Sequence, residues 1–141
     1  MTSAALAGYS TVLKRGNAAT PEVFTTVAEV GDIDGPTLKS QMEDATSHSS
    51  GGWEEKVPTI QSVGQIKFPV NFVPTNATHS YAAGLVLDWK NKTLRNFQMV
   101  WPDATTWTFS AYVAEVAMKG SVKGKLTADI TLDVSGAPTL A

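Results

Sequence analysis

The sequence predicts a mainly β fold: an antiparallel β-sandwich or partial barrel with one flanking α-helix and one long loop. Segments in which apolar and polar residues alternate recur along the chain, and turn-forming Gly, Pro, Asn and Asp residues separate them. Only one segment has a helical period. With 141 residues the chain fits a single domain, residues 1–141, which is large enough to bury an apolar core.

The first part of the chain predicts two short strands. One covers residues 11–15, and the other covers residues 23–30, which are rich in β-branched side chains and end at Gly31. Residues 1–10 are small and polar, so we expect a flexible N-terminal arm.

A long segment without periodicity follows. Residues 39–56 repeat with neither the period of a strand nor that of a helix. Structureless segments of this length are uncommon inside compact domains, where they are usually disordered or functional. We therefore predict a long loop over about residues 40–60, with a plain surface excursion as the alternative.

Residues 62–73 alternate clearly and predict a strand that places Ile66, Phe68, Val70 and Phe72 on one face. Pro69 has no N–H for a ladder hydrogen bond, which favours an edge position or a bulge.

Residues 79–91 predict the helix. Tyr81, Leu85 and Trp89 lie four residues apart and would form one apolar stripe against the sheet, although Gly84 weakens the helix.

Three strands complete the predicted fold. Residues 93–101 and 105–118 would form a hairpin through a tight turn at 102–104. Residues 125–134 alternate almost without exception. The predicted inward set is Leu126, Ala128, Ile130, Leu132 and Val134, and the outward set is Lys125, Thr127, Asp129, Thr131 and Asp133.

Composition excludes several function classes. The formal net charge is −2 without a concentrated basic cluster, so we expect no grip on nucleic acid through phosphates. The chain has no cysteine, which excludes disulfides and thiolate metal sites. Charged residues make up 17%, below the roughly 25% of an average domain, and this deficit hints at subunit interfaces.

We expect no catalytic, cofactor-binding or metal-binding residues. His48 and His79 are the only histidines, lie in separate segments, and are expected on the surface. No nucleophile elbow, phosphate loop or metalloprotease motif occurs. Carboxylates come in pairs, but nothing in the sequence places two of them across a cleft, as a glycosidase needs.

No targeting or membrane segment is expected. The apolar start of the chain lacks a basic flank, and the longest apolar stretch, residues 81–87, is too short to cross a bilayer.

The four tryptophans leave a second function open. A β-sandwich with exposed aromatic rings could be a carbohydrate-binding module. Trp89, Trp101 and Trp107 are expected on apolar faces, and only Trp53 lies in the predicted loop. A single exposed tryptophan suits an anchor at a protein interface better than a sugar platform.

Several segments together carry a resemblance to a family, and they span roughly residues 10–136. The segments are TVLKRG at 11–16, FTTVAEV at 24–30, GP at 35–36, DATSH at 44–48, GWEEKVPTI at 52–60, GQIKFPVNF at 64–72, GSVKG at 120–124 and the last strand. The chain resembles the major tail tube proteins of lambda-like siphophages. Because it ends at Ala141, we expect no additional C-terminal immunoglobulin-like domain of the kind that some members carry.

The resemblance implies a structural, non-enzymatic virion protein that needs no cofactor. Its copies would form hexameric rings, stacked into a helical tube for viral genome ejection, in a tail assembled in the host cytoplasm. The implied partners are further copies, the tape measure protein, the baseplate or tail-tip initiator and the tail terminator. DNA would pass without specific binding, and no membrane would be involved.

The implied tube is geometrically reasonable. Six subunits with four strands each give about 24 strands, and at ~4.8 Å spacing and ~40° tilt these close a barrel about 50 Å wide. The candidate lumen-lining residues are Thr127, Asp129, Thr131 and Asp133, which would make a polar, mildly repulsive wall. The alternative is an ordinary solvated strand face, and Lys125 on the same face weakens the lumen assignment.

The resemblance also implies that the loop over residues 40–60 bridges subunits and adjacent rings, with Trp53 as its anchor. A free loop would order only on docking, which would delay ring stacking. The candidate residues of this loop are Glu43, Asp44, Trp53, Glu54, Glu55 and Lys56.

Overall fold

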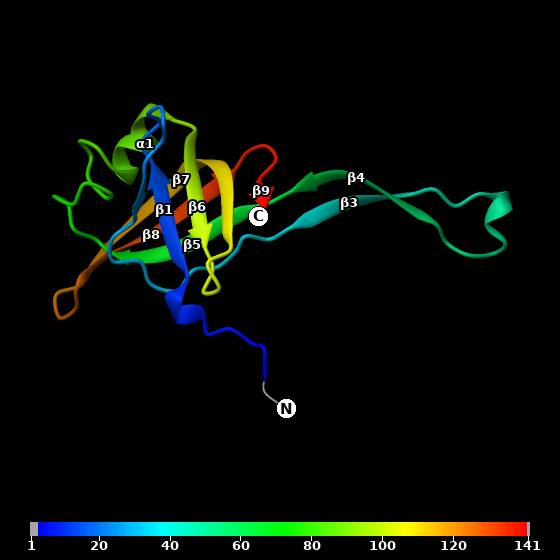
Figure 1. Cartoon of the computed structure of the whole chain (residues 1–141), viewed down its shortest axis with the longest axis horizontal. Coiled ribbons are helices and arrows are strands. Elements are labelled where there is room, and N and C mark those ends of the chain that lie inside the picture. The colour runs from blue at the N-terminus through cyan, green and yellow to red at the C-terminus, as the bar shows by residue number, and fades with distance from the viewer. Residues whose placement is uncertain (1–2, 141) are drawn as a thin grey trace.

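The computed structural model describes residues 3–140, which form a curled β body with a long two-stranded ribbon projecting from it (Figure 1). The elements in chain order are η1 Gly8–Ser10, β1 Val12–Gly16, β2 Phe24–Thr26, β3 Lys39–Asp44, η2 His48–Ser50, β4 Lys56–Ser62, β5 Gln65–Asn71, α1 Leu85–Asn91, β6 Arg95–Val100, β7 Thr106–Gly120, β8 Leu126–Val134 and β9 Thr139–Leu140.

One seven-stranded antiparallel sheet forms the body. Its strand order is β2-β1-β6-β7-β8-β5, and β9 pairs with the start of β7. The predicted hairpin of β6 and β7 is present, with Val100 opposite Thr106. The expected mainly β fold with antiparallel strands and one α-helix is confirmed.

The apolar face of this sheet makes the core. In β5 and β8, alternate residues are buried as predicted, because one face of each strand is covered. Leu126 departs from the pattern and is 41% exposed, since it lies at the hairpin end opposite Gly120, which has no side chain to cover it. The core consists of Leu13, Val27, Ile66, Phe68, Val70, Leu85, Phe97, Met99, Phe109, Ala111, Val113, Ala128, Ile130 and Leu132.

The segment that follows β2 curls the sheet into a partial barrel. Val27 N donates to the Leu13 carbonyl in β1 (2.9 Å), and Gly31 N donates to the Pro69 carbonyl in β5 (2.8 Å). One segment therefore connects β1, near one end of the sheet, to β5 at the other end. The edge position predicted for Pro69 is confirmed. The predicted strand over 23–30 is wrong in length, because the backbone turns at Glu29 (φ 59°).

The predicted helix over 79–91 is also too long, since α1 begins only at Leu85. Gly84 explains the late start: a Cβ there would lie 2.5 Å from the backbone of Ser80, so the chain passes too closely for any other residue. The predicted apolar stripe is wrong as well. Leu85 is buried, but Tyr81 lies outside the helix and is 56% exposed, and Trp89 is 52% exposed.

His79 ties the turns before α1 to the segment after β2. Its Nδ1 accepts a hydrogen bond from Val73 N–H (3.2 Å), so Nε2–H donates to the Ala28 carbonyl (2.6 Å), and its ring stacks on Phe72. The expectation that both histidines lie on the surface is wrong for His79, which is fully buried, whereas His48 is exposed. An imidazole suits this buried position because one ring nitrogen can accept from the Val73 N–H while the other donates to the Ala28 carbonyl.

A buried carboxylate fastens α1 to the sheet. Asp88 accepts two hydrogen bonds from Arg15 of β1 (2.7 and 2.9 Å) and two from Arg95 of β6 (2.8 and 3.2 Å). Bidentate pairs of this kind are among the stronger hydrogen bonds in proteins. Because both arginines come from the sheet, Asp88 ties the helix to β1 and β6, and the helix also packs against β7.

We predict that Asp88→Ala lowers the free energy of unfolding by about 3 kcal/mol, because it leaves two partly buried guanidinium groups without their anion. Urea denaturation measures the change. Asp32→Ala removes an exposed carboxylate and serves as the control, with an expected loss of less than about 0.5 kcal/mol. Equal effects of the two substitutions would contradict this account of the helix.

Candidate functional site

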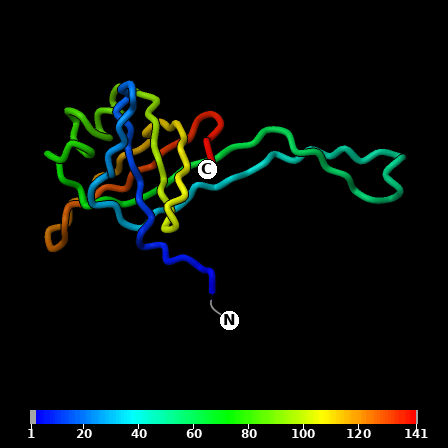
Figure 2. The backbone as a smooth tube through the Cα atoms, in the orientation of Figure 1, coloured from blue at the N-terminus to red at the C-terminus, as the bar shows by residue number. Residues whose placement is uncertain are grey.

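The projecting ribbon is the most distinctive surface of the molecule, and we call residues 39–62 the arm. β3 and β4 pair as antiparallel strands from Lys39 opposite Ser62 to Asp44 opposite Lys56, with a bulge between Ser40 and Met42. Figure 2 shows the arm running away from the body along the long axis of the molecule. The prediction of a loop without regular structure is wrong. Neither face of the arm is buried, so its sequence carries no alternation that would reveal a strand.

Polar side chains organise the arm tip, residues 43–56. Ser47 begins the short helix η2 as its N-cap and exchanges hydrogen bonds with Ser49 and Ser50. Thr46 Oγ1 accepts from Glu55 N–H (2.8 Å) across the tip. The single chain therefore holds the tip in a defined shape, in place of the expected free loop.

Asp44 completes this network. It accepts a hydrogen bond from Thr46 N–H (2.9 Å), and the hydroxyl and backbone N–H of Thr46 lower the pKa of Asp44 below its usual value. Because the folded-state pKa is lowered, the contribution of this carboxylate is present at neutral pH and is lost as the pH falls through the folded-state pKa. The Asp44 side chain is therefore an anion at neutral pH.

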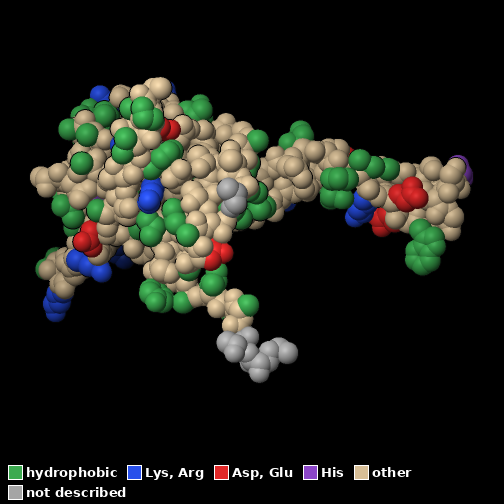
Figure 3. Space-filling view, in the orientation of Figure 1, with side chains coloured by type: hydrophobic (Ala, Val, Ile, Leu, Met, Phe, Trp, Pro, Cys, Tyr) green, Lys and Arg blue, Asp and Glu red, His purple; other side chains and the backbone are tan. Residues whose placement is uncertain are grey.

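All six residues predicted for the inter-subunit loop lie at the arm tip and are exposed: Glu43, Asp44, Trp53, Glu54, Glu55 and Lys56. The arm tip carries four carboxylates and one lysine, Lys56, which forms an ion pair with Glu54 (3.4 Å). Figure 3 shows the acidic side chains near the end of the arm and an apolar side chain projecting beside them.

The arm also exposes apolar surface. Leu38 precedes it, and Met42, Trp53, Val57 and Ile60 extend along it, with Trp53 79% exposed. A two-stranded ribbon alone in water is marginally stable at best. Several large apolar side chains exposed on one thin ribbon are typical of a surface that a partner covers. The single chain therefore leaves the apolar surface of the arm uncovered.

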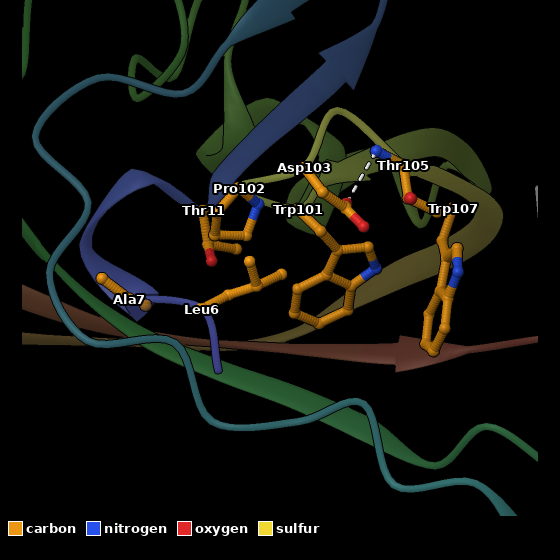
Figure 4. Close-up of a pocket in the computed structure, with 9 residues that line it drawn as sticks. Leu6, Ala7, Thr11, Trp101, Pro102, Asp103, Thr105 and Trp107 are labelled. Carbon is orange, nitrogen blue, oxygen red and sulfur yellow. Dashed lines mark hydrogen bonds between the residues drawn. The ribbon is translucent and has the colours of Figure 1, made fainter. Parts of the chain in front are cut away.

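The N-terminal segment borders a second apolar surface. Trp101 and Trp107 meet edge to face, with ring centroids 5.1 Å apart, and Leu6 lies beside Trp101 in the depression that they line (Figure 4). Tyr9 of η1 projects into solvent. The sequence predicts a flexible N-terminal segment over residues 1–10. Residues 1–2 lie outside the described part of the chain, and residues 8–10 form the single turn η1.

The face of the sheet opposite the core is polar. Thr127, Asp129, Thr131 and Asp133 share it, as predicted from their spacing. The pairing register gives this face Glu115 as a third acid, and it adds lysines from three other strands: Lys14, Lys67 and Lys119. Charges of both signs therefore lie on this face.

Among residues 3–140 no three His, Asp or Glu side chains gather where they could hold a metal ion. Over the same range no helix is long and apolar enough to cross a membrane.

The chain matches the family of the lambda phage tail tube protein over residues 9–141. No curated protein matches it. Among solved structures it is similar to a protein in the tail of an empty gene transfer agent particle of C6 symmetry (20% identity, 97% of this chain and 99% of that chain, TM-score 0.79). It is also similar to a protein of the native gene transfer agent virion (19% identity, 97% and 99%, TM-score 0.76).

A third similar structure is a chain of the sheath-tube complex of the extracellular contractile injection system PVC (13% identity, 99% of this chain and 95% of that chain, TM-score 0.67). At these identities the structures establish the fold. The match to the family, which covers nearly the whole chain, establishes more: this protein belongs to the lambda phage tail tube protein family. It is a structural tube subunit of a phage tail.

We predict that Trp53→Ala changes the free energy of unfolding by less than about 0.5 kcal/mol, because the ring contributes little to the single chain. Met99→Ala, at a fully buried position, serves as the reference and should cost about 2–5 kcal/mol. Chemical denaturation of dilute protein measures the free energy of unfolding of both variants. A large loss for Trp53→Ala would mean that its ring stabilises the body and is no interface residue.

Proposed function

We propose that copies of this chain form six-membered rings that stack into a hollow tube, through which phage DNA leaves the virion. One observation carries the proposal: the arm is exposed along its length in the single chain, although it carries several large apolar side chains. A family of tube subunits and the C6 symmetry of one similar tail support six copies per ring.

The sheet supports a tube wall of the expected size. β5, β8, β7 and β6 are four contiguous strands with one polar face. Six such sets give about 24 strands and a barrel about 50 Å wide, which leaves room for a DNA duplex. Thr127, Asp129, Thr131 and Asp133 would line this lumen. A polar wall with charges of both signs offers DNA phosphates no concentrated basic footprint, so DNA can pass without being held.

The remaining roles follow from such a tube. The arm bridges neighbouring copies within and between rings. A tape measure protein, a tail-tip or baseplate initiator and a tail terminator would set where the tube begins, how long it becomes and where it ends. We assign the tail to the siphovirus type. No step in this function requires catalysis, a cofactor or a membrane.

Deleting residues 46–54 tests the role of the arm. Those residues contribute nothing to the core of the body, so the variant should remain folded. Negative-stain microscopy should show rings or tubes for the full chain and only single particles for the variant. Tubes of normal length from the variant would refute the proposal.

Thr131→Cys tests the lumen, because the chain has no other cysteine. In the single chain, large and small maleimides should both modify it. In preformed tubes, a maleimide on a large polyethylene glycol should react at least about tenfold more slowly, whereas a small maleimide enters. If assembly protects the cysteine equally from both reagents, or protects it from neither, this face does not line the lumen.

A further inference from the structure

A groove on the body lies between the C-terminal end of α1 and the middle of β7. It encloses about 560 Å³, and its lining residues are Trp89, Lys90, Lys92, Tyr112, Val113 and Ala114. Trp89 and Tyr112 are both about half exposed. The groove thus presents the Trp89 ring with two lysines beside it, and no part of the tube wall described above uses α1. Tyr112 borders the groove from the other side of β7, because it pairs with Asp133 on the polar face of the sheet.

The strand edge beside the groove has no partner. β6 pairs with β7 only as far as Arg95 opposite Ala111, while β7 continues to Gly120. Within residues 3–140 no strand pairs with this side of β7 beyond Ala111. A free edge presents backbone donors and acceptors that another chain can satisfy. The groove therefore adjoins a place where a docking segment would gain hydrogen bonds.

The charges of the groove are available as well. Both lysines are exposed, and among the described residues no carboxylate lies within ion-pair distance of either. Lys90 lies over the Tyr81 ring at 5.4 Å. The arm tip carries the opposite sign, with four carboxylates against one lysine, and it carries the exposed Trp53. The two surfaces are complementary in both charge and aromatic character.

We propose that the arm tip of one copy docks into this groove of a neighbouring copy. Trp53 packs against Trp89 at the open edge of β7, and the carboxylates of Glu54 and Glu55 face Lys90 and Lys92. The arm extends away from its own body, so the contact joins two molecules (Figure 1). This inference rests on the proposed function, because it names the surface that receives the arm.

A second basic cluster provides the matched control. Lys123 and Lys125 lie at the exposed turn between β7 and β8, and Lys119 lies nearby in β7. This cluster has the same sign of charge but no aromatic groove. If charge alone attracted the acidic arm tip, the tip would bind this cluster as well as it binds the groove.

Charge-reversal variants distinguish docking in the groove from docking at the basic cluster. K90E/K92E should abolish ring or tube formation, and so should E54K/E55K. Combining the four substitutions should restore assembly, since the pairs are exchanged. K123E/K125E should assemble like the unchanged chain. Trp53→Ala should raise the concentration needed for assembly by about 30-fold, the usual effect of losing an aromatic anchor.

Cross-linking locates the contact directly. The variant S49C/A114C has one cysteine at the arm tip and one in the groove, and oxidation of assembled protein should link it into multimers. S49C/V122C, with its second cysteine at the control cluster, should remain mostly unlinked.

Normal assembly of K90E/K92E, or restoration of assembly in E54K/E55K by adding K123E/K125E, would overturn the inference while leaving the tube function standing. Failure of the unchanged chain to form rings at any concentration would instead count against the tube function itself.

Discussion

A β-sheet needs a cover for its apolar face and partners for its strand edges, and this chain meets the two needs unequally. The body covers its core by curling, with residues 27–34 along β5 and α1 held by Asp88. The arm has no such cover, because every residue of β4 is exposed and only Ser40 of β3 is partly buried. In the proposed tube the partner of the arm is another copy of the chain, which would make assembly part of the fold.

The sequence predicts best where one face of an element is buried. β5 and β8 could be recognised because burial of one face imposes alternation. The arm could not, since both of its faces meet solvent, and its six candidate residues come from the family resemblance instead of from a strand pattern. The start of α1 depends on Gly84 and on the buried His79, whose partners lie far away in sequence. The groove joins α1 to the middle of β7, a proximity that only the pairing of the sheet creates.

The tryptophans separate a tube subunit from a carbohydrate-binding module. A sugar platform needs exposed rings that share one surface. Trp101 and Trp107 are partly buried and stand edge to face against each other. Trp53 lies at the arm tip, whereas Trp89 lies on the body. These placements suit contacts between protein surfaces, in agreement with the family to which the chain belongs.

Amide hydrogen exchange tests the central claim most directly, because it measures whether the arm obtains its stability from other copies. In dilute protein, the amides of residues 39–62 should exchange rapidly while those of β5 to β8 are protected. In assembled protein, the arm amides should become at least about tenfold slower, as docking covers the ribbon. Arm amides that exchange equally fast before and after assembly would show that the arm is free in the tube, and that another surface holds the subunits together.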